Sequence, residues 1–484
     1  MTDLRRAVKW GVVTNVAFGV LSALIGFAVP FLVARSGVDN LFATYAIAIA
    51  IQTLCIAVFE GGGNSALLAF TGESSTVLVL SLLKRRLLMS VLGAVTGGVI
   101  VWLYGLAVPP QHGLEAPVLP VGAAVGISLL GSFFYYCRLA QMKHGGAQTI
   151  QLLSGVLKNS VVIACVQFHS RPAILLWGLV AVQAVEGVIY YVQCRSMLRG
   201  LGPFWSAPPV PDDVAKFSQA SFFYKMSGEV GSSRTLVPLI GWMGGTQIVT
   251  SLQLLIDTVS RTSSVFVLPF GNLIMPVVKR IADRSDVRRL YATSSVAVSS
   301  VAYVLATTIT VVCGSQFLVH YLGESYALWH PLLVALTAAT FAELVVRIGI
   351  SPLVLKRGTH RMIWAGGWLQ LGATAACALL ILAGGSIVTA VVLHSTLRVA
   401  ASYLHLFTDR ETYEAAIPRQ IAVAMLIPVG LLAGRAYLTG DTPAANFFWL
   451  AAAGAISVVV FRREFMTIRH YFTRPGPTGG ARRF

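Results

Sequence analysis

Charged side chains interrupt several long apolar stretches of the chain, and their chemistry needs an explanation. The acids within these stretches are Glu186, Glu229, Asp257 and Glu343. The cations are Lys158, Lys225, Arg234, Arg261, Arg347, Arg398 and Arg435. A charge at the centre of a lipid bilayer costs about 2.5–3.5 kcal/mol on insertion scales, so each one indicates a partner or a function.

Several of these charges stand four residues apart with opposite signs. The pairs are Lys225 with Glu229, Asp257 with Arg261, and Glu343 with Arg347. Because partners at this spacing share one face of a helix, one interpretation is that each pair neutralises itself and lets its helix insert cheaply. The other interpretation is that the charges line a hydrated cavity.

Cations outnumber acids, so a cavity lined by both would be net positive and would suit an anionic headgroup. Arginine binds an anionic group such as a phosphate with two parallel hydrogen bonds. The predicted substrate-binding residues are Lys158, Lys225, Arg234, Arg261, Arg347 and Arg398. The predicted ion-coupling residues are Glu186, Glu229, Asp257 and Glu343.

Lys225 and Arg234 are nine residues apart, on opposite faces of a straight helix. They can share a cavity only if the stretch from Gly228 to Ser233 bends the helix. His394 lies on the same face as Arg398, and we interpret it as a buried core histidine. We interpret Glu60 as a residue at the inner end of a helix and expect Arg435 to snorkel to the outer interface.

The composition indicates which elements position these charges. The 484 residues are 56% hydrophobic and 11% charged, against about 25% charged in soluble domains. The apolar runs are hydrophobic on every side and lack the alternation of a membrane barrel. We therefore predict an all-α polytopic membrane protein with about fourteen transmembrane helices. The expected spans are 10–34, 41–63, 87–108, 118–137, 149–168, 173–193, 218–243, 247–275, 291–313, 330–353, 362–383, 387–407, 421–438 and 446–461.

The basic residues support this count and give an orientation. If the N-terminus is cytoplasmic, the inner segments hold 27 of the 36 Lys and Arg residues. The outer loops hold Arg35 and Arg171, and the other seven lie within spans. This asymmetry predicts that both ends are cytoplasmic. It also explains most of the net charge of +17, so no nucleic-acid partner is needed.

The motifs of common enzymes are missing from the sequence. No Walker A loop, GxSxG elbow or HExxH motif occurs, and the six cysteines stand singly, without metal-ligand spacing. We therefore predict no catalytic residue, no metal and no cofactor.

A shift of 208 residues brings similar features into register. Val29-Pro30 falls on Val237-Pro238, Gly37 on Gly245, and Gly63-Asn64 on Gly271-Asn272. Parallel repeats of this kind are a known transporter plan. We predict two pseudo-symmetric six-helix halves at 1–200 and 218–408, a cytoplasmic linker at 201–217, two extra helices within 409–461, and a basic cytoplasmic tail at 462–484.

The start of the chain resembles a known family. Residues from Lys9 to Gly37, then Phe42 to Tyr45 and the phrase from Glu60 to Ala66, are similar to the opening of polysaccharide exporters of the O-antigen flippase type. These belong to the multidrug/oligosaccharidyl-lipid/polysaccharide (MOP) superfamily. In the second half, Leu268-Pro269-Phe270, Pro276-Val277-Val278 and the basic loop 279–289 are also similar. One departure is the Arg234-Thr235 pair, because many relatives carry an acid midway along the seventh helix.

The resemblance implies a transporter in the bacterial cytoplasmic membrane that flips a polyprenyl-pyrophosphate-linked oligosaccharide by alternating access. Its expected partners are the lipid-linked glycan, the bilayer, other polysaccharide-assembly proteins, and H⁺ or Na⁺ as a coupling ion. Two alternatives stay open within the superfamily: a lipid II flippase, and a cation-coupled multidrug exporter. A non-transporting scaffold of a polysaccharide synthesis complex is a third, although a scaffold would not need the buried charges.

Overall fold

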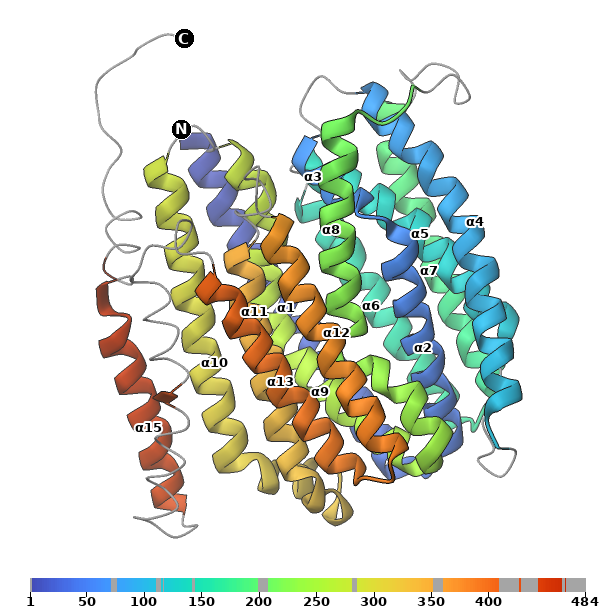
Figure 1. Cartoon of the computed structure of the whole chain (residues 1–484), viewed down its shortest axis with the longest axis vertical. Coiled ribbons are helices and arrows are strands. Elements are labelled where there is room, and N and C mark those ends of the chain that lie inside the picture. The colour runs from blue at the N-terminus through green and yellow to red at the C-terminus, as the bar shows by residue number, and fades with distance from the viewer. Residues whose placement is uncertain are drawn as a thin grey trace.

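The structure is a computed structural model of the whole chain. It describes residues 2–70, 76–109, 115, 117–141, 144–198, 208–280, 285–350, 360–408, 426–427, 443–463 and 466. Within these residues the elements are helices, and the axes of most of them are roughly aligned with one another (Figure 1). The first group is α1 (Thr2–Ser36), α2 (Asp39–Glu60), α3 (Gly63–Phe70), α4 (Thr76–Ala107), α5 (Val118–Ala140), α6 (His144–Gln167) and α7 (Pro172–Leu198). The second group is α8 (Asp212–Val230), η3 (Ser233–Thr235), α9 (Leu236–Arg280), α10 (Ser285–Tyr321), η4 (Glu324–Trp329), α11 (His330–Ile350), α12 (His360–Leu382), α13 (Ile387–Thr408) and α15 (Pro443–Val460).

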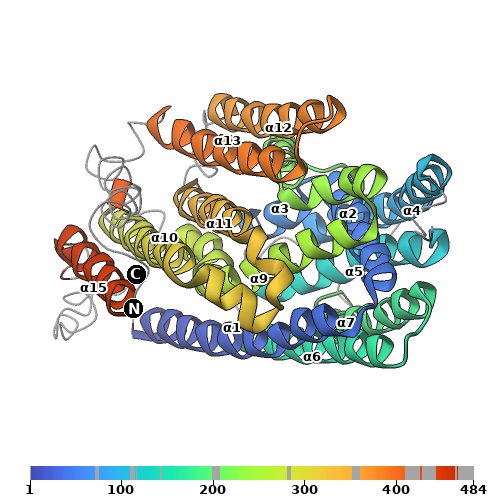
Figure 2. The same cartoon turned by 90° about the horizontal axis from the view of Figure 1, so that it is seen from below.

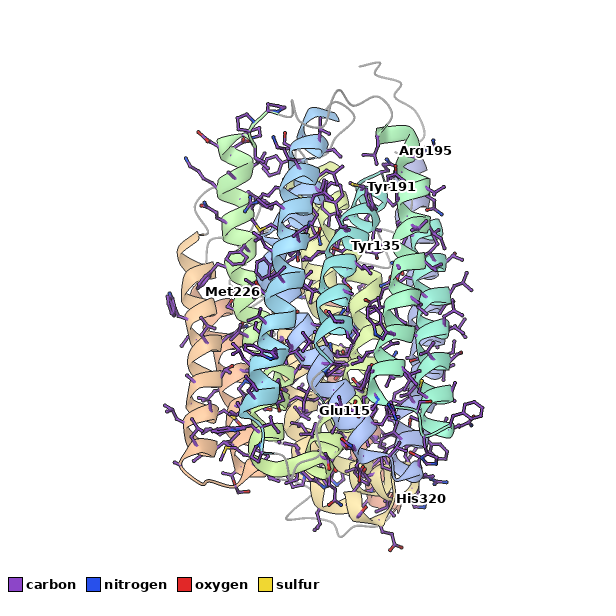
Figure 3. All side chains as sticks on the ribbon, turned by 90° about the vertical axis from the view of Figure 1, so that its right-hand side faces the viewer. Glu115, Tyr135, Tyr191, Arg195, Met226 and His320 are labelled. Carbon is purple, nitrogen blue, oxygen red and sulfur yellow. The ribbon has the colours of Figure 1, made fainter. Side chains whose placement is uncertain are left out.

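The predicted fold class is confirmed: the protein is an all-α polytopic membrane protein. Among the described residues, eight helices are long and apolar enough to cross a membrane, and four shorter helices are also apolar. Large apolar side chains stand exposed on the outer faces of α4 and α7, as helices facing lipid require (Figure 3). The predicted span 421–438 falls almost entirely outside the described residues, as does most of the basic tail.

Positive-φ glycines divide the chain at two matching places. Gly37 has φ 66° and separates α1 from α2, whereas Gly245 has φ 76° and interrupts α9. The predicted boundary between spans 218–243 and 247–275 is thus found at Gly245. The backbone stays helical through Pro269.

The packing of the helices is consistent with the predicted repeat. Under the repeat, α1 corresponds to α8, η3 and the part of α9 before Gly245, and α2 corresponds to the part of α9 after Gly245. The contact of α1 with α9 then corresponds to the contact of α8 with α2, and both occur. Figure 2 shows α9 and α11 between α1 on one side and α12 and α13 on the other. The division into halves at 1–200 and 218–408 stays a proposal, which these paired contacts support.

The seventh predicted span is broken. Helix α8 ends at Val230, Gly231 follows, and the chain passes through the short helix η3 before α9 begins at Leu236. The break lies where the sequence indicated that a bend would be needed. Glycine fits here because a Cβ on Gly231 would stand 2.9 Å from Cβ of Gln370 on α12. Broken helices release backbone groups, and such breaks occur where they line a cavity.

Candidate functional site

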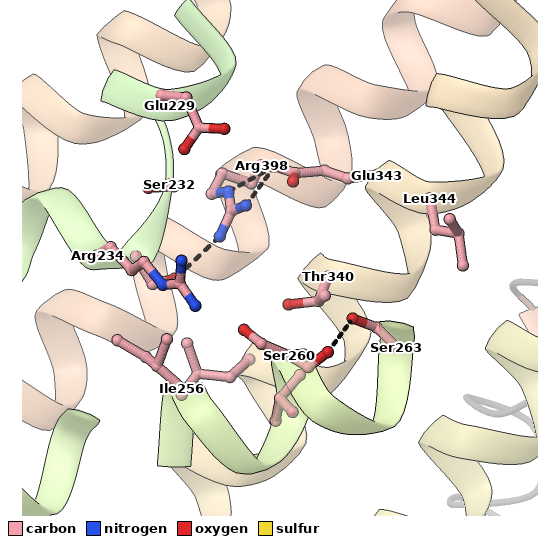
Figure 4. Close-up of a pocket in the computed structure, with 13 residues that line it drawn as sticks. Glu229, Ser232, Arg234, Ile256, Ser260, Ser263, Thr340, Glu343, Leu344 and Arg398 are labelled. Atoms are coloured by element: carbon pink, nitrogen blue, oxygen red, sulfur yellow. Dashed lines mark hydrogen bonds and ion pairs between the residues drawn. The ribbon is translucent and has the colours of Figure 1, made fainter. Parts of the chain in front are cut away.

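The break between α8 and α9 borders a polar cavity of about 260 Å³. Helices α9, α11 and α13 form its other walls (Figure 4). The charged residues in the lining are Glu229, Arg234, Glu343 and Arg398, and the hydroxyl residues are Ser232, Ser233, Ser260, Ser263 and Thr340. The remaining lining residues are Ile256, Val259, Leu336 and Leu344. A cavity with this many polar groups inside a membrane protein indicates a path or a site for a polar ligand.

In one guanidinium of the cavity, each of the three nitrogen atoms has a polar partner. Arg398 on α13 donates from Nε to Oε1 of Glu343 on α11 at 2.6 Å, and its Nη2 lies 2.5 Å from the same oxygen. Its Nη1 donates to Oγ of Ser233 in η3 at 2.9 Å. The side chains of Arg398 and Glu343 are only 5% and 9% exposed. This cluster therefore ties the break to α11 and α13.

The other charged groups of the cavity are loosely held. Arg234 lies 3.8 Å from Oδ1 of Asp257, which is beyond hydrogen-bond distance. That oxygen instead accepts a hydrogen bond from Nε2 of Gln253 at 2.9 Å. The carboxylate of Glu229 has no hydrogen-bond or ion-pair partner among the described residues, and it points into the space beside Arg398 (Figure 4).

The predicted site residues do not all gather at this cavity. Of the ten, Arg234, Arg398, Glu229 and Glu343 line it. These four are balanced, two cations against two acids, so the cavity lining lacks the cationic excess expected from the sequence. Asp257 stands behind Arg234 as its nearest acid.

The remaining predicted residues lie in other places. Lys158 pairs with Glu186 at 2.7 Å between α6 and α7. Nη2 of Arg261 lies 3.4 Å from Oδ1 of Asn159, which joins α9 to α6. The side chain of Arg347 falls outside the described residues. A role for these residues in binding or coupling stays a prediction.

The spacing along the sequence predicted the wrong ion-pair partner for Lys225. Its Nζ lies 2.8 Å from Oε1 of Glu60 on α2, and Glu229 is not its partner. The same Glu60 oxygen accepts a hydrogen bond from the backbone of Asn64, whose Oδ1 in turn accepts one from the buried Arg86. Glu60 is therefore part of a polar network between α2, α3, α4 and α8, which its position at a helix end did not reveal.

We expect the ion pair of Lys225 and Glu60 to contribute to stability. Replacing Glu60 with Gln should lower the free energy of unfolding by about 1–3 kcal/mol, because it leaves a half-buried ammonium without its counter-charge. Reversing both charges, Glu60→Lys with Lys225→Glu, should recover part of the loss. Thermal unfolding in detergent measures both, and an unchanged midpoint for Glu60→Gln contradicts the expectation.

The buried polar residues near the break extend the site beyond the charges. Nε2 of His394 lies 3.3 Å from Oγ1 of Thr374, and that hydroxyl donates to the released carbonyl of Val230 at 3.0 Å. His394 is fully buried, as its interpretation as a core histidine requires. The sequence did not single out Ser232, Ser260 or Thr340 as cavity residues, and only the position of Ser232 beside the expected bend signalled any of them.

With this geometry established, the chain can be compared with solved structures, and it shares the fold of two membrane proteins. The chain is similar to the MATE multidrug transporter DinF-BH, with a TM-score of 0.57 and 14% identity over 84% of this chain and 96% of that one. It is also similar to the lipid II flippase MurJ in an inward closed conformation, with a TM-score of 0.56 and 12% identity over 95% of this chain and 100% of that one. No protein-family profile and no curated protein sequence matches the chain.

Proposed function

We propose that the protein is a transporter that flips a polyprenyl-pyrophosphate-linked oligosaccharide across the bacterial cytoplasmic membrane. The observation that carries the proposal is the cavity beside the broken helix, where two arginines face a polar space of about 260 Å³. The guanidinium of Arg234, held only by a loose ion pair with Asp257 at 3.8 Å, suits a phosphate oxygen, and the surrounding hydroxyls suit a sugar. The polyprenyl tail would remain in the lipid throughout.

The size of the cavity sets what it would hold in this conformation. It lies just below the range of about 300–1,000 Å³ that is typical of sites for drug-sized ligands. We infer that it accepts the pyrophosphate and the sugar next to it, not a whole oligosaccharide. Alternating access would widen it toward one side of the membrane at a time, with Arg398 and Glu343 moving as one unit because they are bound together.

Energy for the cycle would come from a gradient of H⁺ or Na⁺. Glu229 and Glu343 in the cavity, and Asp257 behind it, are the candidate groups in this part of the molecule. Both chain ends would be cytoplasmic, and other polysaccharide-assembly proteins are the expected partners. Such a protein would move its substrate without covalent chemistry and would not be an enzyme.

Two related functions have support of their own. Lipid II export is favoured by the similarity to MurJ along 95% of this chain. Export of cationic drugs is favoured by the unpaired carboxylate of Glu229, because an acid in a partly apolar cavity attracts cations. The charge balance does not decide between an anionic and a cationic substrate, so the anion is proposed from the loosely paired guanidinium of Arg234.

Depletion of the protein from growing cells tests the proposal. We expect complete polyprenyl-linked repeat units to accumulate on the inner face of the membrane while their synthesis continues. Accumulation of lipid II alone would favour the peptidoglycan alternative. Normal lipid-linked intermediates together with increased drug sensitivity would contradict the proposal and favour multidrug export.

We expect Arg234→Gln to reduce transport at least about tenfold, because one charge-assisted hydrogen bond to phosphate is worth about 1.5–3 kcal/mol. Arg171→Gln is the matched control, since Arg171 is exposed in the loop before α7. The rate of movement of a lipid-linked glycan in proteoliposomes measures both. Equal rates for the two variants would exclude Arg234 as a substrate-binding residue.

A further inference from the structure

The cavity holds two opposite charges that do not pair with each other. The carboxylate of Glu229 and the guanidinium of Arg234 line the same space, yet they do not form an ion pair within 4.0 Å. The other two charges, on Arg398 and Glu343, are bound to each other at 2.5 Å. After these are set aside, the cavity lining has one cation that is held only by a loose ion pair, Arg234 with Asp257 at 3.8 Å, and one anion, Glu229.

The backbone explains why the two available charges stay apart. Glu229 lies in the last turn of α8, and Arg234 lies in η3, on the other side of Gly231 and Ser232. The break fixes each charge on its own short element. Because the two charges do not approach each other closely, each can still interact with a group of opposite charge on a ligand.

The neighbouring polar groups do not satisfy these two charges. Arg234 makes no hydrogen bond with a described residue, and its nearest acid, Asp257, is 3.8 Å away and already accepts from Gln253. Oγ of Ser232, which lies between the two charges in the sequence, is buried without a hydrogen-bond partner. Figure 4 shows that Glu229 and Arg234 face the cavity from opposite sides of the break between α8 and α9.

We propose that the cavity binds a zwitterionic headgroup, with a phosphate at Arg234 and a protonated amine at Glu229. An amino sugar linked through phosphate to a lipid has this chemistry, and so does a phosphoethanolamine group. The inference rests on the proposed function and narrows its substrate class. It also gives Glu229 a role in substrate recognition in place of ion coupling. A ligand with only one of the two charges would meet only one of these two groups of the cavity.

Two matched pairs of soluble probes test this inference on the purified full-length protein at pH 7. Glucosamine 1-phosphate and glucose 1-phosphate differ only by an amine in place of a hydroxyl. O-phosphoethanolamine and 2-hydroxyethyl phosphate differ in the same way. Calorimetric titration should give a dissociation constant about tenfold lower for the amine member of at least one pair. Preference within the first pair indicates an amino sugar, and preference confined to the second indicates a phospholipid head.

The variants assign the preference to a residue. In Glu229→Gln the tenfold advantage of the amine should vanish while binding of the phosphate-only probes persists, and in Glu229→Asp part of the advantage should return. Glu324→Gln, the same change at an exposed acid in η4, should keep the full advantage. If Glu229→Gln unfolds, the Asp variant still tests the inference, because a shorter carboxylate should lower the ratio.

The failure of this inference can be told apart from the failure of the proposed function. Equal affinities within both pairs, or an amine advantage that persists in Glu229→Gln, would overturn the zwitterionic headgroup and leave the flippase proposal standing. Loss of ion-driven transport in Glu229→Gln with an unchanged amine preference would assign Glu229 to coupling and would also overturn the inference. Failure of all four probes to bind would count against the phosphate-binding cavity itself, and so against both.

Discussion

Replacing Arg398 with Ala lowers the free energy of unfolding by about 3–5 kcal/mol, on the present account, because it leaves the carboxylate of Glu343 buried without its counter-charge. The loss exceeds that of an ordinary surface mutation, since the guanidinium also donates to Ser233 and so joins α13 to η3 and α11. Chemical unfolding in detergent measures the effect. Arg171→Ala is the control, and its exposed position predicts a change within about 0.5 kcal/mol.

A second comparison separates stability from function at the same pair. Arg398→Leu combined with Glu343→Leu should recover most of the lost stability, because well-packed apolar residues replace buried ion pairs at little cost. Transport should not recover, since the pair ties the broken helix to its neighbours. A double variant that transports at the wild-type rate would show that the pair only neutralises itself. A single variant as stable as the wild type would contradict the burial described for Arg398.

Gly62→Ala should lower the free energy of unfolding by about 2–6 kcal/mol. Gly62 lies in the turn between α2 and α3 with φ +70°, a conformation that costs a residue with a side chain about 1–3 kcal/mol. In addition, a Cβ there would stand 2.0 Å from the backbone carbonyl oxygen of Ser218 on α8, and overpacking typically costs a further 1–3 kcal/mol. The backbone of α8 must therefore move away from α2.

Gly37→Ala is the matched control for this prediction. Gly37 has a similar φ of +66°, but nothing lies within 4 Å of the position of its Cβ. Its replacement should cost only the backbone strain, the same about 1–3 kcal/mol as at Gly62. Unfolding midpoints of the two variants in the same detergent give the difference, which is the cost of pushing α8 from α2. Equal midpoints would mean that the two helices separate without loss.

The local features of the fold could be predicted from the sequence because they depend on neighbouring residues. The apolar run in α2 is hydrophobic on every side, so its burial in lipid or protein follows from composition. The turn at Gly245 and the break at Gly231 to Ser233 were both indicated by glycine and serine within a long apolar stretch.

The partners of the buried charges could not be predicted, because they are set by which helix faces meet. Spacing along the sequence finds neighbours on one helix, and so it paired Lys225 with Glu229. Packing of α8 against α2 instead brings Lys225 to Glu60, 165 residues away. In the same way α11 and α13 bring Glu343 to Arg398. The cavity lining is therefore balanced in charge, with two cations and two acids, although the predicted spans together contain more cations than acids.

The central claim is most directly tested by following one lipid-linked glycan across a membrane that contains only this protein. Proteoliposomes would carry a polyprenyl-pyrophosphate-linked amino sugar on both faces, and an enzyme added outside would consume what it can reach. Wild-type protein should expose the inner half of the lipid within the assay, and Arg234→Gln should expose it at least about tenfold more slowly. Exposure by the wild-type protein no faster than in protein-free liposomes would contradict the claim.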